Sequence, residues 1–290
     1  MGKPTAEIDL SIELVSELIL SQHPDLAELP IAELASGWDN AMFRLGEHMA
    51  IRLPRRSAAA QLLLHEQRWL PVLQRQLPLP VPAPIRIGRP QNSYPWSWSI
   101  TPWIEGETAN RAHLNSDQGE TLATFLDALH TTAPEQAPVN PYRGIPLSQR
   151  SARFSSGVSA LAGRGQALDG RLLQLWDTAV ATPVDAAPTW IHGDLHSNNV
   201  LVASGRICGV IDWGDLARGD RATDLAATWI LFSQGDTRER VLQSCKSVSA
   251  DTWCRARGWA LLLAVILLES ADPTHVTTAE LTMQRLRDGP

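Results

Sequence analysis

The chain has 290 residues, of which 44% are hydrophobic and 19% charged, proportions that suit a globular protein large enough to bury a core. Its formal net charge of −6 argues against nucleic-acid binding, which requires a basic surface. The three cysteines form no CxxC pair, so they argue against a disulfide framework and against a structural zinc site.

Neither a targeting segment nor a membrane span is predicted. The N-terminus lacks a basic flank followed by an apolar run, so it does not have the pattern of a signal peptide. The most apolar stretch, residues 259–268, is too short to cross a bilayer and is typical of a buried helix. We therefore expect a cytoplasmic protein without a membrane partner.

The first hundred residues predict a small antiparallel sheet with helices beside it. Apolar residues at helical spacing indicate a helix over residues 10–20 and a long helix over residues 57–76. Short β-prone runs separated by turn residues indicate an antiparallel meander. The expected strands are residues 31–35, 42–45, 49–53, 85–87 and 98–103.

The rest of the chain predicts mostly helices around a small hairpin. A break in the pattern at residues 101–106 indicates a hinge, and a Pro-rich loop is expected over residues 131–146. The expected helices are residues 117–130, 148–161, 171–181 and most of the chain after residue 220; the expected strands are residues 189–192, 200–203 and 207–211. This order predicts an α+β fold in two lobes, residues 1–103 and 104–290, with a cleft between them.

One loop carries the most informative polar residues. The run His192-Gly193-Asp194-Leu195-His196-Ser197-Asn198-Asn199 lies between two expected strands. A carboxylate at Asp194 can orient an attacking hydroxyl and accept its proton, and the amide oxygen of Asn199 can bind a divalent cation. This pair suits phosphoryl transfer, in which positioning and charge neutralisation do most of the work.

A second carboxylate follows the next expected strand. Ile211-Asp212-Trp213-Gly214 places Asp212 at the strand end, beside the first loop. A carboxylate there suits Mg²⁺ that bridges the phosphates of a nucleotide.

Together these motifs resemble the catalytic and metal-binding segments of the aminoglycoside and macrolide phosphotransferases, relatives of the protein kinases. The resemblance rests on His-x-Asp-x-x-x-x-Asn and Ile-Asp-x-Gly, and it continues through residues 219–226 and Leu129-His130. It is looser before the hinge, at residues 37–40, 51–55, 66 and 103–106, and covers roughly residues 30–270. It implies a protein-kinase-like fold with a small N-terminal sheet lobe and a larger helical lobe.

The resemblance also assigns roles to single residues. It implies that Asp194 is the catalytic base and that Asn199 and Asp212 bind Mg²⁺. Arg52 occupies the position of the kinase lysine on the third strand, and Glu66 is its expected ion-pair partner. Two further residues are expected to bind the nucleotide: Gly37 in the phosphate loop and Trp103 at the hinge.

Three departures from the kinase pattern matter. Arg52 replaces a lysine, and an arginine fork engages phosphates differently from a point charge. Only Gly37 is present where kinases have three spaced glycines. No Ala-Pro-Glu follows Asp212, which favours a small molecule over a protein as acceptor.

Other interpretations of these residues stay open at this point. Asp194 could be a turn residue, His192 and His196 could bind the metal of a hydrolase, and Arg52 and Glu66 could form a surface salt bridge. Asp220 and Asp224 are expected to brace loops rather than bind a ligand. Asp215 could approach the metal or the substrate, or face solvent.

The sequence therefore predicts an ATP- or GTP-dependent, Mg²⁺-dependent O-phosphotransferase acting on a small-molecule hydroxyl. An aminoglycoside or macrolide antibiotic is the acceptor that the resemblance suggests first, and a cationic acceptor would suit the acidic chain. The alternatives are a metabolic kinase of an amino alcohol or sugar and a non-catalytic nucleotide-binding module.

Overall fold

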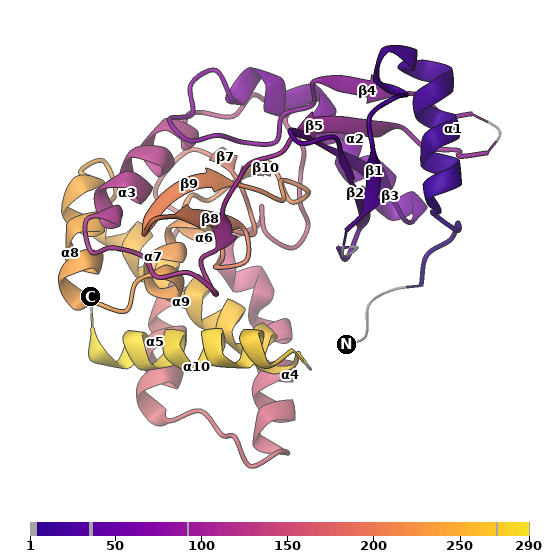
Figure 1. The fold of residues 1–290 in the computed structure, drawn as a ribbon. Helices are drawn as coiled ribbons and strands as arrows, with labels where there is room; N and C mark the ends of the chain where they lie inside the picture. The colour runs from indigo at the N-terminus through magenta and orange to yellow at the C-terminus, as the bar shows by residue number, and fades with distance from the viewer. Residues whose placement is uncertain (1–4, 35–36, 92, 271, 290) are drawn as a thin grey trace.

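The chain folds into two lobes. The computed structural model describes residues 5–34, 37–91, 93–270 and 272–289. Figure 1 shows a sheet-rich N-terminal lobe, with α1 on its outer side, next to a larger and mainly helical C-terminal lobe. The expected α+β, two-lobed arrangement is confirmed.

The N-terminal lobe is a five-stranded antiparallel sheet of order β1-β2-β3-β5-β4. Its strands are β1 Ile31–Glu33, β2 Asn40–Leu45, β3 Met49–Pro54, β4 Arg86–Gly88 and β5 Trp98–Pro102. Every expected strand is present. The first ends at Glu33, and the last position expected for it, Ala35, lies outside the described residues.

Two helices cover this sheet. Helix α1 spans Ile12–Gln22 and α2 spans Ser57–Leu73. Ile51 of β3 packs in one apolar cluster with α1, and because successive side chains of a strand point to opposite faces, its neighbour Arg52 faces α2. This alternation therefore places Arg52 on the face of the sheet that α2 covers.

The chain leaves the first sheet at Pro102 and enters a second one at Glu107. Strand β6, Glu107–Thr108, pairs with β8, Val200–Ala203, which pairs in turn with β9, Arg206–Val210. Trp103 lies between the two sheets, and its backbone N–H donates to the carbonyl of His48 at 2.8 Å. Strand β6 was not predicted. The lobe boundary between residues 103 and 104 stays a prediction.

A two-stranded sheet holds the polar loops of the C-terminal lobe. Strand β7, Thr189–Ile191, pairs antiparallel with β10, Ala217–Gly219, which was also not predicted. The loop of residues 192–199 leaves β7, and residues 212–216 lead into β10. The pairing therefore brings the two polar segments of the sequence side by side.

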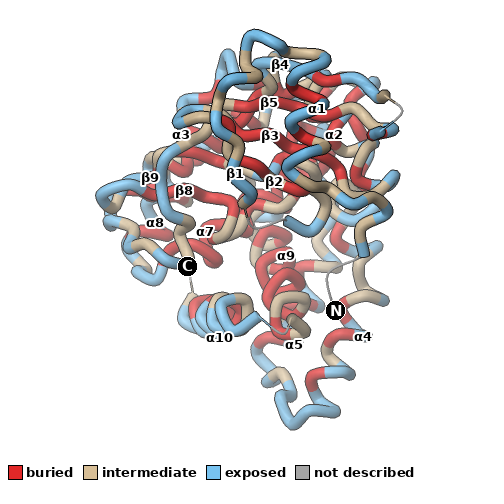
Figure 2. Tube along the Cα trace, turned by 45° about the vertical axis from the view of Figure 1, so that its right-hand side comes forward, coloured by how far each residue is buried: buried red, intermediate tan, exposed pale blue. Residues whose placement is uncertain are grey.

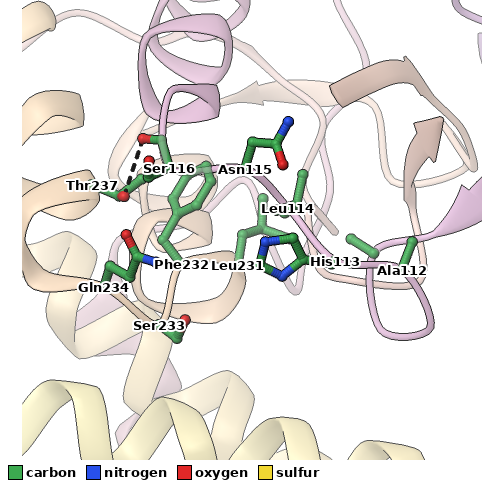
Figure 3. Close-up of a pocket in the computed structure, with 11 residues that line it drawn as sticks. Ala112, His113, Leu114, Asn115, Ser116, Leu231, Phe232, Ser233, Gln234 and Thr237 are labelled. Carbon is green, nitrogen blue, oxygen red and sulfur yellow. Dashed lines mark hydrogen bonds between the residues drawn. The ribbon is translucent and has the colours of Figure 1, made fainter. Parts of the chain in front are cut away.

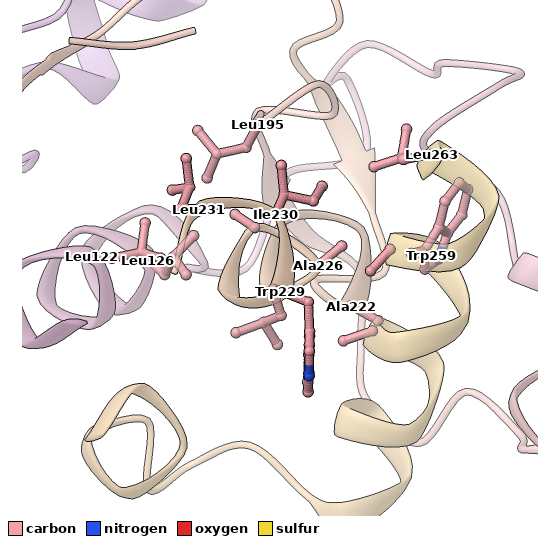
Figure 4. Close-up of a cluster of buried hydrophobic side chains, with 14 of the residues drawn as sticks. Leu122, Leu126, Leu195, Ala222, Ala226, Trp229, Ile230, Leu231, Trp259 and Leu263 are labelled. Carbon is pink, nitrogen blue, oxygen red and sulfur yellow. The ribbon is translucent and has the colours of Figure 1, made fainter. Parts of the chain in front are cut away.

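Helices pack around one buried helix in this lobe. Most of α9, Ala250–Leu268, is buried, as Figure 2 shows, and its side chains join those of α3, α6 and α7 in one cluster (Figure 4). The remaining bounds are α3 Gln118–Leu129, α4 Ser151–Ala162, α5 Gly170–Ala181, α6 Ala222–Leu225, α7 Ala227–Leu231, α8 Gly235–Ser244 and α10 Pro273–Asp288. Among the described residues, no helix is both long and apolar enough to span a bilayer.

Asp220 belongs to the support of this lobe. It accepts hydrogen bonds from Arg255, a residue of α9 whose buried side chain also donates to Asp185 at 2.8 Å. Buried charges need such partners, because an unpaired one is costly. The interpretation of Asp220 as a bracing residue agrees with this contact.

Candidate functional site

The loop of residues 192–199 is anchored by a buried carboxylate. Both oxygens of Asp224, on α6, accept hydrogen bonds from the loop backbone: Oδ2 from the N–H of His192 at 2.7 Å and Oδ1 from that of Gly193 at 2.8 Å. His130 lies 3.3 Å from the same carboxylate. Asp224 is fully buried. It therefore braces the loop, as the sequence indicated.

His192 is also a structural residue. Its Nε2 lies 3.0 Å from the carbonyl oxygen of Ile211, and its Nδ1 accepts from the backbone N–H of Asp194 at 3.2 Å. Both ring nitrogens are thus occupied. Within the described part of the chain, no group of three or more His, Cys, Asp or Glu side chains is arranged to hold a metal. The hydrolase interpretation has no support here.

Asp194 is held on both carboxylate oxygens. Arg143 Nη2 donates to Oδ1 at 2.9 Å, and His196 Nε2 lies 3.2 Å from Oδ2. Asn199 Nδ2 donates to the backbone carbonyl of Asp194 at 2.8 Å. Burial raises the pKa of the Asp194 carboxyl, but the positive charges of His196 and Arg143 outweigh it and hold the pKa well below its usual range. The carboxylate is ionised at neutral pH.

Asp212 lies next to this loop. The backbone N–H of Ile211 donates to the carbonyl of Asn199 at 2.9 Å, so the two segments are hydrogen-bonded to each other. Asp212 has a left-handed backbone, with φ +61°, which is uncommon outside glycine and is often found at functional sites. Its carboxylate is largely exposed and lies 3.9 Å from Arg52. Asp194, Asn199 and Asp212 are thus brought together.

Arg52 and Glu66 form a buried ion pair. Arg52 Nη2 donates to Glu66 Oε1 at 3.1 Å and Nη1 donates to Oε2, which makes the contact bidentate. Burial lowers the pKa of Arg52, but the carboxylates of Glu66 and Asp212 outweigh it and raise the pKa. The guanidinium is therefore charged. The surface salt bridge that the sequence left open is wrong, because both side chains are nearly inaccessible to solvent.

A cleft of about 340 Å³ runs between the N-terminal sheet and the loops of the second lobe. Four predicted residues line it: Gly37, Arg52, Trp103 and Asp212. Its walls also include apolar side chains from both lobes, and the lining list adds Met42, Ala50, Pro82, Ile104, Leu201 and Ile211. Such a mixture of an apolar pocket with a few charged groups is typical of a small-ligand site. Glu66 lies behind Arg52, while Asp194 and Asn199 lie in the adjoining loop.

Gly37 and Trp103 both line the cleft. The N–H of Gly37 donates to the carbonyl of Asn40 at 2.8 Å, which closes a tight turn before β2. A Cβ at Gly37 would lie no closer than 3.5 Å to that oxygen, so packing alone does not require glycine. The guanidinium of Arg44 lies 4.0 Å over the ring of Trp103.

The geometry of these loops agrees with the sequence comparisons. The model of the phosphotransferase enzyme family matches residues 30–259, most of the chain. The chain belongs to this family. It is 29% identical over 140 residues to an aminoglycoside 3'-phosphotransferase of Escherichia coli, a match that covers 46% of this chain and 52% of that enzyme. The chain thus spans about half the length of the aminoglycoside phosphotransferases it matches. Over a longer stretch, 81% of the chain, it is 23% identical to the uncharacterised protein YcbJ of Bacillus subtilis, of which it covers 82%.

Solved structures of phosphotransferases share the fold. The GDP complex of aminoglycoside 2'-phosphotransferase-IIIa superposes with a TM-score of 0.72 at 19% identity, covering 97% of this chain and all of that one. A macrolide 2'-phosphotransferase from Brachybacterium faecium gives a TM-score of 0.64 at 18% identity, over 96% of this chain and 98% of that one. The expected kinase-like phosphotransferase fold is confirmed.

Four residues near Asp194 were missed or left open by the sequence: Arg143 and Asn140 received no role, and Asp215 was left between a ligand contact and solvent. Arg143 and Asn140 come from the loop after α3, whose polar composition indicated only a loop. His196 was weighed only as a metal ligand. Asp215 accepts from Asn140 Nδ2 at 2.5 Å, and burial, together with the charge of Asp194, raises the pKa of Asp215 to about 6. A polar loop has no periodic pattern, so its sequence gives no signal for such contacts.

A second, smaller cavity lies away from these residues. It has a volume of about 150 Å³ and lies between the segment before α3 and the segment that joins α7 to α8 (Figure 3). Thr237 Oγ1 donates to the carbonyl of Ser116 at its edge. None of the seven predicted site residues lines it, so it is separate from the cleft that Arg52 and Asp212 line.

Proposed function

We propose that this protein is a Mg²⁺-dependent O-phosphotransferase that transfers the γ-phosphate of ATP or GTP to a hydroxyl of a small molecule. The observation that carries the proposal is the meeting of Asp194, Asn199 and Asp212 on two hydrogen-bonded segments, with Arg52 3.9 Å from Asp212 at the cleft. This is the set of groups that phosphoryl transfer requires.

The cleft is the proposed nucleotide site. Arg52, held in place by Glu66, points a fixed positive charge at the phosphates, and the Gly37 turn covers them. Trp103 and its neighbours in the segment between the two sheets contact the base. Related solved structures contain GDP or ADP, so we propose the corresponding triphosphates, GTP and ATP, as donors to be tested.

The oxygen groups at the cleft fit Mg²⁺. Asn199 donates through its amide nitrogen to Asp194, and no hydrogen bond to Asn199 Oδ1 is found among the described residues, which leaves this oxygen for a cation. The carboxylate of Asp212 is largely exposed. Mg²⁺ prefers such oxygen ligands and usually keeps waters and phosphates as further ligands. When bound, Mg²⁺ would neutralise charge that develops on the phosphate oxygens.

Asp194 has the proposed role of base. The acceptor hydroxyl donates a hydrogen bond to its carboxylate, which orients the oxygen toward the γ-phosphorus. The new O–P bond forms as the bond from phosphorus to the bridging oxygen of the nucleoside diphosphate breaks, and the hydroxyl proton passes to Asp194. The low pKa of Asp194 keeps it ionised and ready to orient the hydroxyl.

Aminoglycoside and macrolide antibiotics are the proposed acceptors. This proposal is supported by the relatives: one solved aminoglycoside phosphotransferase contains kanamycin and another contains streptomycin with ATP, while other structural neighbours are macrolide phosphotransferases.

A metabolic kinase is the second candidate function, and one observation favours it. Arg143 contacts Asp194, and Arg150 lies close enough to Arg143 for the repulsion to lower the pKa of Arg150, after the larger effect of burial. One guanidinium group on the proposed base, with a second one close to the first, suits a hydroxylated metabolite with a carboxylate or phosphate better than a polycation.

A transfer assay tests the proposal. The purified protein is incubated with Mg²⁺ and ATP or GTP against kanamycin, streptomycin, gentamicin, a macrolide and a set of hydroxylated carboxylates and phosphates. Asp194→Asn is expected to lower kcat about 100- to 10,000-fold without weakening nucleotide binding. Asp177→Asn, an exposed change on α5, is the control. Near-normal activity of Asp194→Asn would refute the assigned role, and absence of transfer to every acceptor would favour a non-catalytic module.

A further inference from the structure

We propose that Arg143 is a positioning residue that sets the orientation of the Asp194 carboxylate for phosphoryl transfer. The proposal rests on the proposed function, since it assumes that Asp194 receives the acceptor hydroxyl. It adds the loop between α3 and α4 to the parts of the chain that build the active site.

The two oxygens of Asp194 have different partners on opposite sides. Arg143 Nη2 donates to Oδ1 at 2.9 Å, while Oδ2 lies 3.2 Å from His196 Nε2 and 3.4 Å from Asn199 Nδ2. His196 and Asn199 belong to the same loop as Asp194, so they move with it. Arg143 is therefore the contact that fixes the carboxylate against a different part of the lobe.

Arg143 is itself held by its own loop. Asn140 Oδ1 accepts hydrogen bonds from the backbone N–H groups of Tyr142 at 2.8 Å and Arg143 at 2.9 Å, which forms a turn closed by a side chain. The hydroxyl of Thr223, on α6, donates to the carbonyl of Arg143 at 3.1 Å. The backbone of Arg143 is thus fixed before its side chain reaches Asp194.

The same turn is tied to the segment that carries the second carboxylate. Asn140 Nδ2 donates to Asp215 Oδ1, so one side chain joins the loop to residues 212–216. Gly144, which follows Arg143 in the chain, packs so closely on β10 that a Cβ would lie 2.7 Å from the carbonyl oxygen of Arg218. The close approach leaves the loop little freedom to shift relative to the active site.

The guanidinium of Arg143 lies near charges of both signs, which a simple stabilising ion pair does not need. Besides Asp194, it interacts with Asp215, with His196 and with the like-charged Arg150. Its side chain is 15% exposed and that of Asp194 is 23% exposed, so both have lost most of their water. Arg143 and His196 both lie against the proposed base and repel each other, an arrangement often found where a site is built for function.

The test compares Arg143→Met and Arg143→Lys with Arg153→Met. Arg153 is a matched control: it forms a partly buried, two-bond ion pair with Glu269, but it has no contact with Asp194. Each variant is assayed for nucleotide binding by calorimetry, for melting temperature, and for kcat and KM with the best acceptor of the transfer assay.

Arg143→Met is expected to lower kcat about 10- to 100-fold, the effect of a misplaced catalytic group, with the acceptor KM and nucleotide binding within about twofold of wild type. Arg143→Lys is expected to recover part of kcat, because it restores one donor. In an Asp194→Ala background, followed with radiolabelled nucleotide, Arg143→Met should have no further effect. Arg153→Met should leave kcat unchanged.

Three kinetic results would overturn the inference. They are a kcat for Arg143→Met within twofold of wild type, a rise in acceptor KM with kcat unchanged, which would make Arg143 an acceptor-binding residue, and an equal loss of kcat in Arg153→Met. A wild-type protein that transfers phosphate to no acceptor would instead refute the proposed function. A crystal structure of Arg143→Met separates the cases without any activity: an Asp194 carboxylate that keeps its orientation rejects the positioning role.

Discussion

Arg52 on β3 and Glu66 on α2 are joined by two hydrogen bonds between a guanidinium and a carboxylate, with 5% and 1% of the two residues exposed. A lysine, which is the kinase residue at this position, has a single donor group and could not make this parallel pair. The planar fork therefore replaces the lysine with a more rigidly oriented charge at the wall of the cleft. The guanidinium also lies 3.9 Å from the carboxylate of Asp212.

Removal of one partner of this pair should destabilise the fold. Arg52→Met leaves the carboxylate of Glu66 buried without a counter-charge, so the free energy of unfolding is expected to fall by about 3–5 kcal/mol. The double change Arg52→Met with Glu66→Leu should recover most of this loss, since no buried charge remains. Urea unfolding measures both, and calorimetry with ATP and GTP should show nucleotide binding lost in each. Recovery of nucleotide binding in the double variant would mean that Arg52 does not contact the phosphates.

Loss of Asp212 should weaken the binding of Mg²⁺. Activity is expected to disappear with EDTA and to return with Mg²⁺, because the proposed ligands are oxygens that prefer this ion. Asp212→Asn should raise the Mg²⁺ concentration for half-maximal activity by more than about tenfold, since even the loss of groups that only support a ligand has this effect. A Mg²⁺ titration of transfer activity checks it, with the exposed Asp177→Asn as control. An unchanged Mg²⁺ dependence would exclude Asp212 as a ligand.

Asp215 should give stability a distinct pH dependence. Its pKa is raised to about 6 in the fold, above the value near 3.9 of an unfolded aspartate, so the fold favours the protonated form. This contribution is fully present below about pH 4 and is lost as the pH rises through 6. Asp215→Asn stays neutral and keeps the oxygen that accepts from Asn140. Its stability relative to wild type should therefore improve from pH 4 to pH 7.

Urea unfolding of the two proteins at pH 4, 5, 6 and 7 measures this difference. If the difference in the free energy of unfolding does not change with pH, the fold does not raise the pKa of Asp215. The Asp177→Asn variant, whose side chain is exposed, should show no trend.

Two glycines should respond in opposite directions to alanine. A Cβ at Gly88 on β4 would lie 1.8 Å from the indole of Trp98, its partner on β5, so Gly88→Ala should lower the free energy of unfolding by about 1–3 kcal/mol. Gly170 begins α5 with no atom within 4 Å of a Cβ, and Gly170→Ala should raise it by about 0.4–1 kcal/mol. Thermal and urea unfolding check both. Equal effects at the two positions would contradict the packing of Trp98 on Gly88.

The sequence predicted the parts of the fold that depend on local patterns. The apolar spacing of α2 and the turn residues between β2 and β3 were enough to place Arg52 on a strand and Glu66 on a helix, and the family resemblance implied that the two side chains pair. The strands β6 and β10 were missed because a strand of two or three residues has no periodicity of its own; it forms only when a neighbouring strand is already present.

The candidate site was likewise predictable only where its residues lie close together in the sequence. Asp194 and Asn199 lie five residues apart in one loop, so their spacing alone carried the interpretation. Arg143 could not be found in this way, because its contact with Asp194 joins residues 51 positions apart and depends on a turn made by Asn140. The spacing of residues along the chain holds no information about such a pairing before the lobe is folded.

The carboxylate of Asp224 has a consequence for how the protein opens and closes locally. It receives the amide hydrogens of both His192 and Gly193, and it belongs to α6, which packs on α9. These two amides can exchange with solvent deuterium only when α6 is released, so their protection should match that of the most slowly exchanging part of the lobe. The loop that carries Asp194 is therefore not a mobile lid. We expect it to share one cooperative unit with α9, so the contacts of Asp194 should persist for as long as α9 stays folded.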